Sequence, residues 1–189
     1  MNAHKEGLIK LIREDNWMLD ILKKVRALHL HDWWICAGFV RSKIWDHIHE
    51  FSERTPLPDS DVIYYDAQQT EELLEKRWEA ELNRLDPHVP WSVKNQARMH
   101  HLNQVKPYQS STDAIAKFPE TATALGVTLD ENNKIKIAAP HGLEDVYHGI
   151  IKPTVFFKET AERMEVYEQR IQKKQWHMTW PNIFYNSIV

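Results

Sequence analysis

The sequence predicts an α+β fold, with a short mixed sheet backed by helices, N-terminal helices and a helical C-terminal extension. Apolar residues recur every three or four positions over residues 3–30, as in amphipathic helices. Short apolar and aromatic runs at residues 33–37 and 59–66 have the composition of buried strands. No repeat, low-complexity tract or linker interrupts the chain. We therefore expect one domain over residues 1–189, with the C-terminal extension beginning at about residue 150.

The first elements alternate between helical and extended patterns. Residues 3–30 predict one or two helices, and Asp15 and Asn16 are residue types that cap the start of a second helix. The strand expected at residues 33–37 ends at Gly38. An amphipathic helix is expected to follow it up to about Phe51.

The later elements follow a proline-containing loop at residues 52–58. The β-branched and aromatic residues of the segment DSDVIYYD favour a strand over residues 59–66. The remaining expected elements are a charged helix at 70–85, a strand at 89–93, helices at 96–102 and 112–125, a hairpin at 127–129 and 134–138, and helices at 143–150 and 158–176.

Composition places the chain among globular proteins. Apolar residues make up 42% and charged residues 27% of its 189 residues, which does not indicate wholesale disorder. The single cysteine, Cys36, cannot form an internal disulfide and lies in an apolar run, which predicts a buried thiol. The sequence has no apolar stretch of membrane-spanning length, and its start lacks the pattern of a signal peptide. We therefore expect a cytoplasmic protein without a membrane partner.

Two carboxylates, Asp59 and Asp61, form the most informative pair in the sequence. Residues two apart in a strand project from the same face, so their like charges would lie close together. Such a pair is costly unless a cation lies between them. Oxygen ligands of this kind suit Mg²⁺ or Mn²⁺, which would take further ligands from water and substrate phosphates. Carboxylates that hold such cations are what phosphoryl or nucleotidyl transfer requires.

The turn at Gly38 is a second candidate feature. A glycine between a strand and a helix brings backbone N–H groups and the helix N-terminus close to a phosphate. Arg41, in the first turn of the expected helix, offers a fork of donors to the same group. Spacing alone also fits a simpler interpretation, in which Asp59 and Asp61 are strand-edge residues and Arg41 is a surface charge.

A resemblance to a known family strengthens the first interpretation. The string AGFVRSKIWD, followed by DSDV, resembles the glycine-containing signature and paired-aspartate strand of the DNA polymerase β-like nucleotidyltransferase superfamily. The whole pattern resembles a bacterial family of small nucleotidyltransferase-like proteins and covers roughly residues 33–181. Its segments are GFVRSKIWD, PLPDSDVIYYD, WSVKNQARMH, PETATALGV, APHGLEDV and WHMTWP.

The resemblance implies a role for each candidate residue. Gly38, Phe39 and Arg41 fall on the nucleotide-binding turn, although the superfamily usually has a small residue where this chain has Phe39. Asp59 and Asp61 fall on the metal-binding, catalytic strand.

Two polar residues that follow the strand expected at residues 89–93 are further candidates. The resemblance favours Asn95 and Arg98 as contacts to the nucleotide base or phosphate. The alternative is that Asn95 caps a helix and that Arg98 lies on a solvated face.

The superfamily also places a third carboxylate on a neighbouring strand. Residues 90–95 contain none, and Asp66 or Glu120 would have to replace it.

By this resemblance, the protein is a Mg²⁺-dependent nucleotidyltransferase that moves a nucleoside monophosphate from an NTP to an unidentified small-molecule or protein acceptor. The net charge of −3 makes a nucleic-acid acceptor less favoured, because gripping a phosphate backbone requires basic residues. One alternative is a catalytically inactive nucleotide-binding protein on the same fold. Another is a protein-interaction module, in which some of the eight tryptophans form a docking face rather than an aromatic core.

Overall fold

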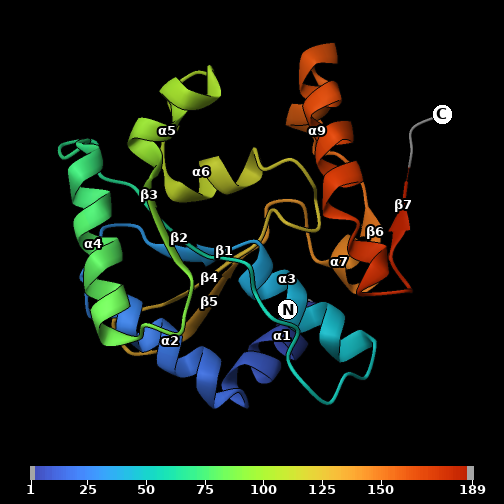
Figure 1. The fold of residues 1–189 in the computed structure, drawn as a ribbon, viewed down its shortest axis with the longest axis horizontal. Coiled ribbons are helices and arrows are strands. Elements are labelled where there is room, and N and C mark those ends of the chain that lie inside the picture. The colour runs from blue at the N-terminus through green and yellow to red at the C-terminus, as the bar shows by residue number, and fades with distance from the viewer. Residues whose placement is uncertain (1–2, 187–189) are drawn as a thin grey trace.

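The computed structural model describes residues 3–186, which are built around a five-stranded sheet (Figure 1). The strand order is β3-β2-β1-β4-β5. β2 and β3 are parallel, and every other neighbouring pair is antiparallel. The strands are β1 (Trp34–Cys36), β2 (Ser60–Tyr64), β3 (Trp91–Asn95), β4 (Gly126–Leu129) and β5 (Ile135–Ala138). The predicted α+β fold with a short mixed sheet is therefore confirmed.

Helices from the first half of the chain cover this sheet. They are α1 (Ala3–Arg13), α2 (Asn16–Arg26), α3 (Gly38–Ile48) and α4 (Glu72–Leu85). α1 contacts β5, α2 contacts β4, α3 contacts β1 and β2, and α4 contacts β3. The Asp15 side chain accepts a hydrogen bond from the Met18 N–H at 3.0 Å, which confirms the predicted cap of α2.

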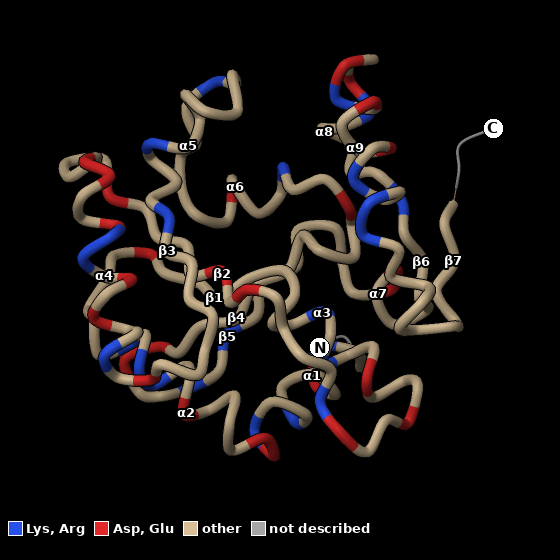
Figure 2. The backbone as a smooth tube through the Cα atoms, in the orientation of Figure 1, with Lys and Arg blue, Asp and Glu red and all other residues tan. Residues whose placement is uncertain are grey.

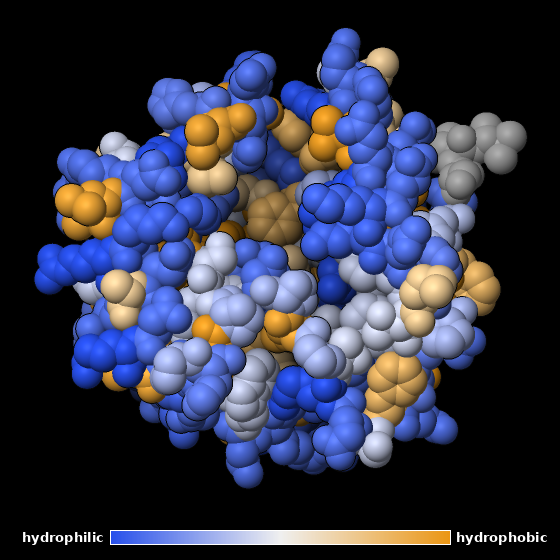
Figure 3. Space-filling view, in the orientation of Figure 1, coloured by the Kyte–Doolittle hydropathy of each residue, from blue (hydrophilic) through white to orange (hydrophobic). Residues whose placement is uncertain are grey.

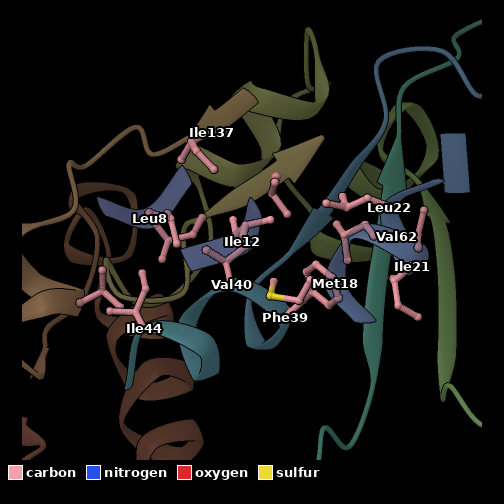
Figure 4. Packing of buried hydrophobic residues seen from close by; sticks show 14 of the residues in the cluster. Leu8, Ile12, Met18, Ile21, Leu22, Phe39, Val40, Ile44, Val62 and Ile137 are labelled. Carbon is pink, nitrogen blue, oxygen red and sulfur yellow. The ribbon is translucent and has the colours of Figure 1, made fainter. Parts of the chain in front are cut away.

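The hydrophobic core lies where α1, α2 and α3 meet the sheet (Figure 4). α1 and α2 each turn an apolar stripe towards the strands, as the spacing of their apolar residues predicts. α3 is buried over most of its surface, including the polar residues Arg41, Ser42 and Asp46. The labelled residues are Leu8, Ile12, Met18, Ile21, Leu22, Phe39, Val40, Ile44, Val62 and Ile137. Phe39 and Val40 of α3 and Val62 of β2 belong to this core, and the candidate functional residues lie at the starts of these two elements.

The second half of the chain adds two walls above the sheet in Figure 1. α5 rises on one side, α9 rises on the other, and α6 lies between them. These elements are α5 (Gln96–Asn103), α6 (Ser111–Ala116), α7 (Glu144–Tyr147), α8 (Val155–Lys158), α9 (Ala161–Lys174) and the 3-10 helix η1 (Trp176–Met178). A two-stranded parallel sheet pairs β6 (Ile150–Ile151) with β7 (Phe184–Tyr185), near the end of the described chain.

Some predicted boundaries were wrong. The helix expected over 112–125 ends at Ala116, because Pro119 disfavours helical backbone in the residue before it. The strand expected at 89–93 lies at Trp91–Asn95. The helix expected over 158–176 begins only after Thr160, whose side chain caps α9, and it ends where Gln175 adopts a left-handed conformation. The predicted hairpin is confirmed as β4 and β5.

Among the described residues, no helix has the length and apolar character that crossing a membrane requires. The single-domain organisation stays a prediction.

Candidate functional site

A cavity of about 250 Å³ lies where the start of α3, the loop before β2 and the end of α9 meet. Asp59 and Asp61 contribute carboxylates to its wall, and Arg41, Arg170 and Lys174 contribute cations. Figure 2 shows the basic residues along α9 and the acidic residues at the start of β2. The cavity therefore combines both charges in a small space.

The two carboxylates of this cavity lie at the start of β2. Asp61 is in the strand beside Ser92 of β3, and Asp59 directly precedes it. Burial and the neighbouring negative charge of Asp59 raise the pKa of Asp61 from 3.8 to about 6. A hydrogen bond from Ser92 and the positive charges of Arg170 and Lys174 lower this pKa by smaller amounts. Negative charge is therefore incompletely compensated here, which suits a bound cation.

The donor set fits a hard divalent cation. It consists of two carboxylates open to a cavity, and Mg²⁺ in such sites takes most of its ligands from water and phosphate. Within residues 3–186, no group of three or more His, Cys, Asp and Glu side chains could hold a metal. Asp59 and Asp61 would therefore hold the ion as a pair, with substrate completing its coordination.

The raised pKa of Asp61 predicts a pH-dependent stability of the metal-free protein. The folded state binds the Asp61 proton more tightly than the unfolded state, so Asp61 favours folding at low pH and this contribution is lost as the pH rises from about 4 to 6. We expect the loss to be about 2 kcal/mol, allowing for partial exposure. Urea unfolding in EDTA at pH 4.5 and pH 7 measures it. An identical pH difference in wild type and Asp61→Asn would contradict this prediction.

The start of α3 faces the same cavity through Ala37 and Gly38. No side chain caps this helix, and the Val40 and Arg41 N–H groups donate to the Ala37 carbonyl, so the N–H groups of Gly38 and Phe39 are the ones available to an anion. The Phe39 side chain is in the core, 2% exposed and with its ring centroid 5.8 Å from that of Trp17. Any contact of Phe39 with a nucleotide would therefore come from its backbone.

Arg41 lies inside a cage of three indole rings. Its guanidinium carbon is 4.9 Å from the ring centre of Trp45, 4.6 Å from that of Trp176 and 5.9 Å from that of Trp180. Arg41 is 6% exposed, and burial lowers its pKa to about 10, so it remains charged at neutral pH. The Trp180 indole also donates a hydrogen bond to Asp46 at 2.9 Å. These tryptophans thus form an aromatic core that fastens the C-terminal segment to α3 and orients Arg41.

Arg170 and Lys174 belong to the cavity, and the sequence did not reveal them. They lie four residues apart on α9 and therefore on one face of it. Arg170 Nε donates to Glu120 at 2.6 Å, and the Thr123 hydroxyl donates to the other carboxylate oxygen of Glu120 at 2.6 Å. Glu120 is fully buried, so it positions Arg170 and does not line the cavity as a third carboxylate. The only local signal was a pair of basic residues at helical spacing.

Asn95 and Arg98 lie away from the carboxylate pair: Asn95 is the last residue of β3, and Arg98 follows it in α5. Asn95 is opposite Tyr64, whereas Ser92 is opposite Asp61. The Asn95 side chain is 1% exposed and caps α5 through the Ala97 N–H.

The side chains of Arg98 and Asp66 also have hydrogen-bond partners within the chain. Arg98 forms a forked ion pair with Glu75 at 3.0 and 2.7 Å. Asp66 accepts from the N–H groups of Gln68 and Gln69 in a turn. Asn95, Arg98 and Asp66 do not line the cavity, and a nucleotide contact by Asn95 or Arg98 stays a prediction.

A mixed sheet that presents a carboxylate pair beside a helix N-terminus and basic side chains is typical of a nucleotidyl-transferring domain. The family comparison agrees with this class. A family model described as nucleotidyltransferase matches residues 23–184. The chain therefore belongs to the nucleotidyltransferase family, as the resemblance indicated.

Solved structures show which proteins share this fold. A protein whose NMR structure reveals a CCA-adding enzyme head domain is 34% identical, with a TM-score of 0.87 over 96% of this chain and 95% of that one. A CCA-adding enzyme in complex with CTP is 11% identical, with a TM-score of 0.60. This chain aligns over 94% of its own length and spans 43% of that enzyme. Because the identity is only 11%, the likeness shows the fold alone. The comparison with curated proteins gave no match.

Proposed function

We propose that the protein transfers a nucleoside monophosphate from an NTP to an acceptor, assisted by Mg²⁺ or Mn²⁺ at Asp59 and Asp61. The main observation behind this proposal is that the carboxylate pair shares one cavity with the start of α3, Arg170 and Lys174. Membership of the nucleotidyltransferase family supports this assignment. The solved complexes of CCA-adding enzymes with CTP and ATP suggest nucleoside triphosphates as the donors.

Each part of the cavity has a role in this reaction. Asp59 and Asp61 hold the ion, which would neutralise charge on the phosphates and activate an acceptor hydroxyl. The N–H groups at the start of α3 and the Lys174 ammonium attract the triphosphate. Glu120 and the tryptophan cage fix Arg170 and Arg41, so their charges need no reorganisation. The acceptor oxygen bonds to the α-phosphorus, the bond to pyrophosphate breaks, and the hydroxyl proton passes to water.

The acceptor belongs to the same proposal. A small molecule or a protein in the cytoplasm suits the net charge of −3 better than a long nucleic acid.

A second candidate function is nucleotide binding without turnover. It is favoured by one specific observation: Ser92, and not a carboxylate, stands beside Asp61 on β3. Serine is a poor Mg²⁺ ligand and a poor general base at neutral pH. Product formation distinguishes this sensor function from the transferase, because a binding protein releases no pyrophosphate.

Thermal unfolding with each of the four NTPs, with and without Mg²⁺ or Mn²⁺, tests the site itself. We expect at least one NTP to stabilise the wild type only when metal is present, by about 2.7 kcal/mol at roughly 100 times its Kd. The Asp59→Ala/Asp61→Ala double variant should lose this stabilisation, because it has no metal ligands. Asp20→Ala, which removes an exposed carboxylate on α2, is the matched control and should keep it. The absence of stabilisation by every NTP would sink the proposal.

A further inference from the structure

A second and larger cavity, of about 710 Å³, lies between α5 and α9. Figure 3, in the orientation of Figure 1, shows the molecule hollowed between these two walls, with hydrophobic residues on both rims. Leu102 of α5 and Val166 of α9 line it and are 61% and 54% exposed. Two apolar side chains thus line the cavity on opposite walls without being buried in the core.

The lining of the larger cavity suits a planar, polar-edged ring. Phe118 and Phe156 bring half-buried aromatic rings from two separate segments, and aromatic faces of this kind stack on nucleobases. The Arg163 guanidinium lies over the Phe156 ring, with its carbon 3.7 Å from the ring centre, and a planar guanidinium also stacks on a base. Gln96 and Asn103 bring side-chain amides, which both donate and accept hydrogen bonds. Ring faces combined with a few amide groups are typical of sites that bind a heterocycle.

Arg170 connects this cavity to the carboxylate site, because its side chain lines both. In the smaller cavity, Arg170 shares the lining with Asp59 and Asp61. A ligand with phosphates at Asp59 and Asp61 would therefore pass Arg170 as it extends into the larger cavity.

The smaller cavity has no stacking surface for a base. At about 250 Å³, it is lined mostly by polar and charged groups. Its tryptophan rings enclose the Arg41 guanidinium and are buried, with Trp176 and Trp180 each 4% exposed. The base of a bound NTP therefore needs another surface, and the larger cavity provides one.

We propose that the cavity between α5 and α9 binds the nucleoside of the NTP, with the base stacked on its aromatic wall. This inference rests on the proposed function, since the triphosphate is placed at Asp59 and Asp61. It assigns substrate recognition to the C-terminal half of the chain, whereas the metal site depends on the N-terminal half. An acceptor molecule in the same cavity is the competing occupant.

The test compares Mg²⁺–NTP with Mg²⁺–tripolyphosphate, which has the phosphates but no nucleoside. By calorimetry, we expect the wild type to bind its preferred NTP at least about tenfold more tightly than tripolyphosphate, because only the NTP stacks. Leu102→Glu and Val166→Glu should each weaken NTP binding about tenfold and leave tripolyphosphate binding unchanged. Tripolyphosphate is at least as negatively charged as an NTP, so general repulsion would weaken both ligands.

Matched controls come from exposed apolar residues outside the cavity lining. Leu73 of α4 is 78% exposed and Val155 of α8 is 69% exposed, so Leu73→Glu and Val155→Glu should leave both affinities unchanged. Equal affinities of the wild type for NTP and tripolyphosphate would overturn the inference, as would unchanged NTP binding in the Leu102 and Val166 variants. If neither ligand binds the wild type, the proposed function itself fails. Tripolyphosphate binding that is lost in Asp59→Ala/Asp61→Ala keeps the proposed function, whatever the nucleoside result.

Discussion

Asp61→Asn is expected to lower the rate of pyrophosphate release from an NTP at least about a thousandfold. The change removes one of two carboxylates that would hold the metal ion, whose stabilisation of the transition state amounts to several kcal/mol. The substitution keeps the shape of the side chain and removes its repulsion with Asp59. The metal-free variant should therefore be at least as stable as the wild type at pH 7. The measurement is pyrophosphate release with Mg²⁺ and a panel of hydroxyl-bearing acceptors, water included.

Asp66→Asn is the matched control for this experiment. Asp66 lies just beyond β2 and accepts hydrogen bonds from the backbone N–H groups of Gln68 and Gln69 in a turn. An asparagine side-chain oxygen can accept the same hydrogen bonds. It does not line the cavity, so its variant should keep full activity. Unchanged pyrophosphate release in Asp61→Asn would remove the basis for the metal site. Loss of release in Asp66→Asn would instead revive this residue as the third carboxylate.

Arg98→Ala is expected to lower the free energy of unfolding by roughly 3 kcal/mol. Its partner Glu75 is fully buried, and both of its carboxylate oxygens accept from the Arg98 guanidinium. Removing Arg98 leaves a buried carboxylate that still contacts the Asn95 N–H at 2.9 Å and the Lys94 ammonium at 3.6 Å. Urea unfolding at pH 7 measures the loss. The expected value is at the low end for a broken buried pair because these partners remain.

Lys94→Ala is the control for Arg98, because Lys94 also contacts Glu75 but is more distant and 30% exposed. We expect it to cost less than about 1 kcal/mol. NTP binding by Arg98→Lys separates a structural role from a nucleotide contact. A variant that folds stably and yet loses Mg²⁺–NTP binding would support the contact predicted from the sequence. A destabilised variant with unchanged NTP affinity would support the ion pair as its main role.

Local patterns were sufficient to predict much of the fold. The apolar spacing of residues 3–30 predicted α1 and α2, because apolar residues recur every three or four positions along the buried face of a helix. Alternation in the strand expected at residues 59–66 predicted that Asp59 and Asp61 lie on one side. In the structure both residues line one cavity, although Asp59 directly precedes β2. The helix expected over 112–125 failed because Pro119 and contacts outside that segment end α6 early, and Glu120 forms a bridge with Pro153 instead.

The sequence by itself indicated the family, through segments spread over residues 33–181. It also predicted the helices and strands, the pair Asp59 and Asp61 and the turn at Gly38, because each of these depends on residues that are close in the chain. Only the tertiary structure brought Arg170 and Lys174 of α9 to that pair and buried Glu120 beneath Arg170. It also brought the Trp176 and Trp180 rings of the C-terminal segment to Arg41, beside the ring of Trp45 on the same helix. The reason is physical: spacing along a helix or strand is set locally, whereas contacts between distant segments depend on how their buried faces pack.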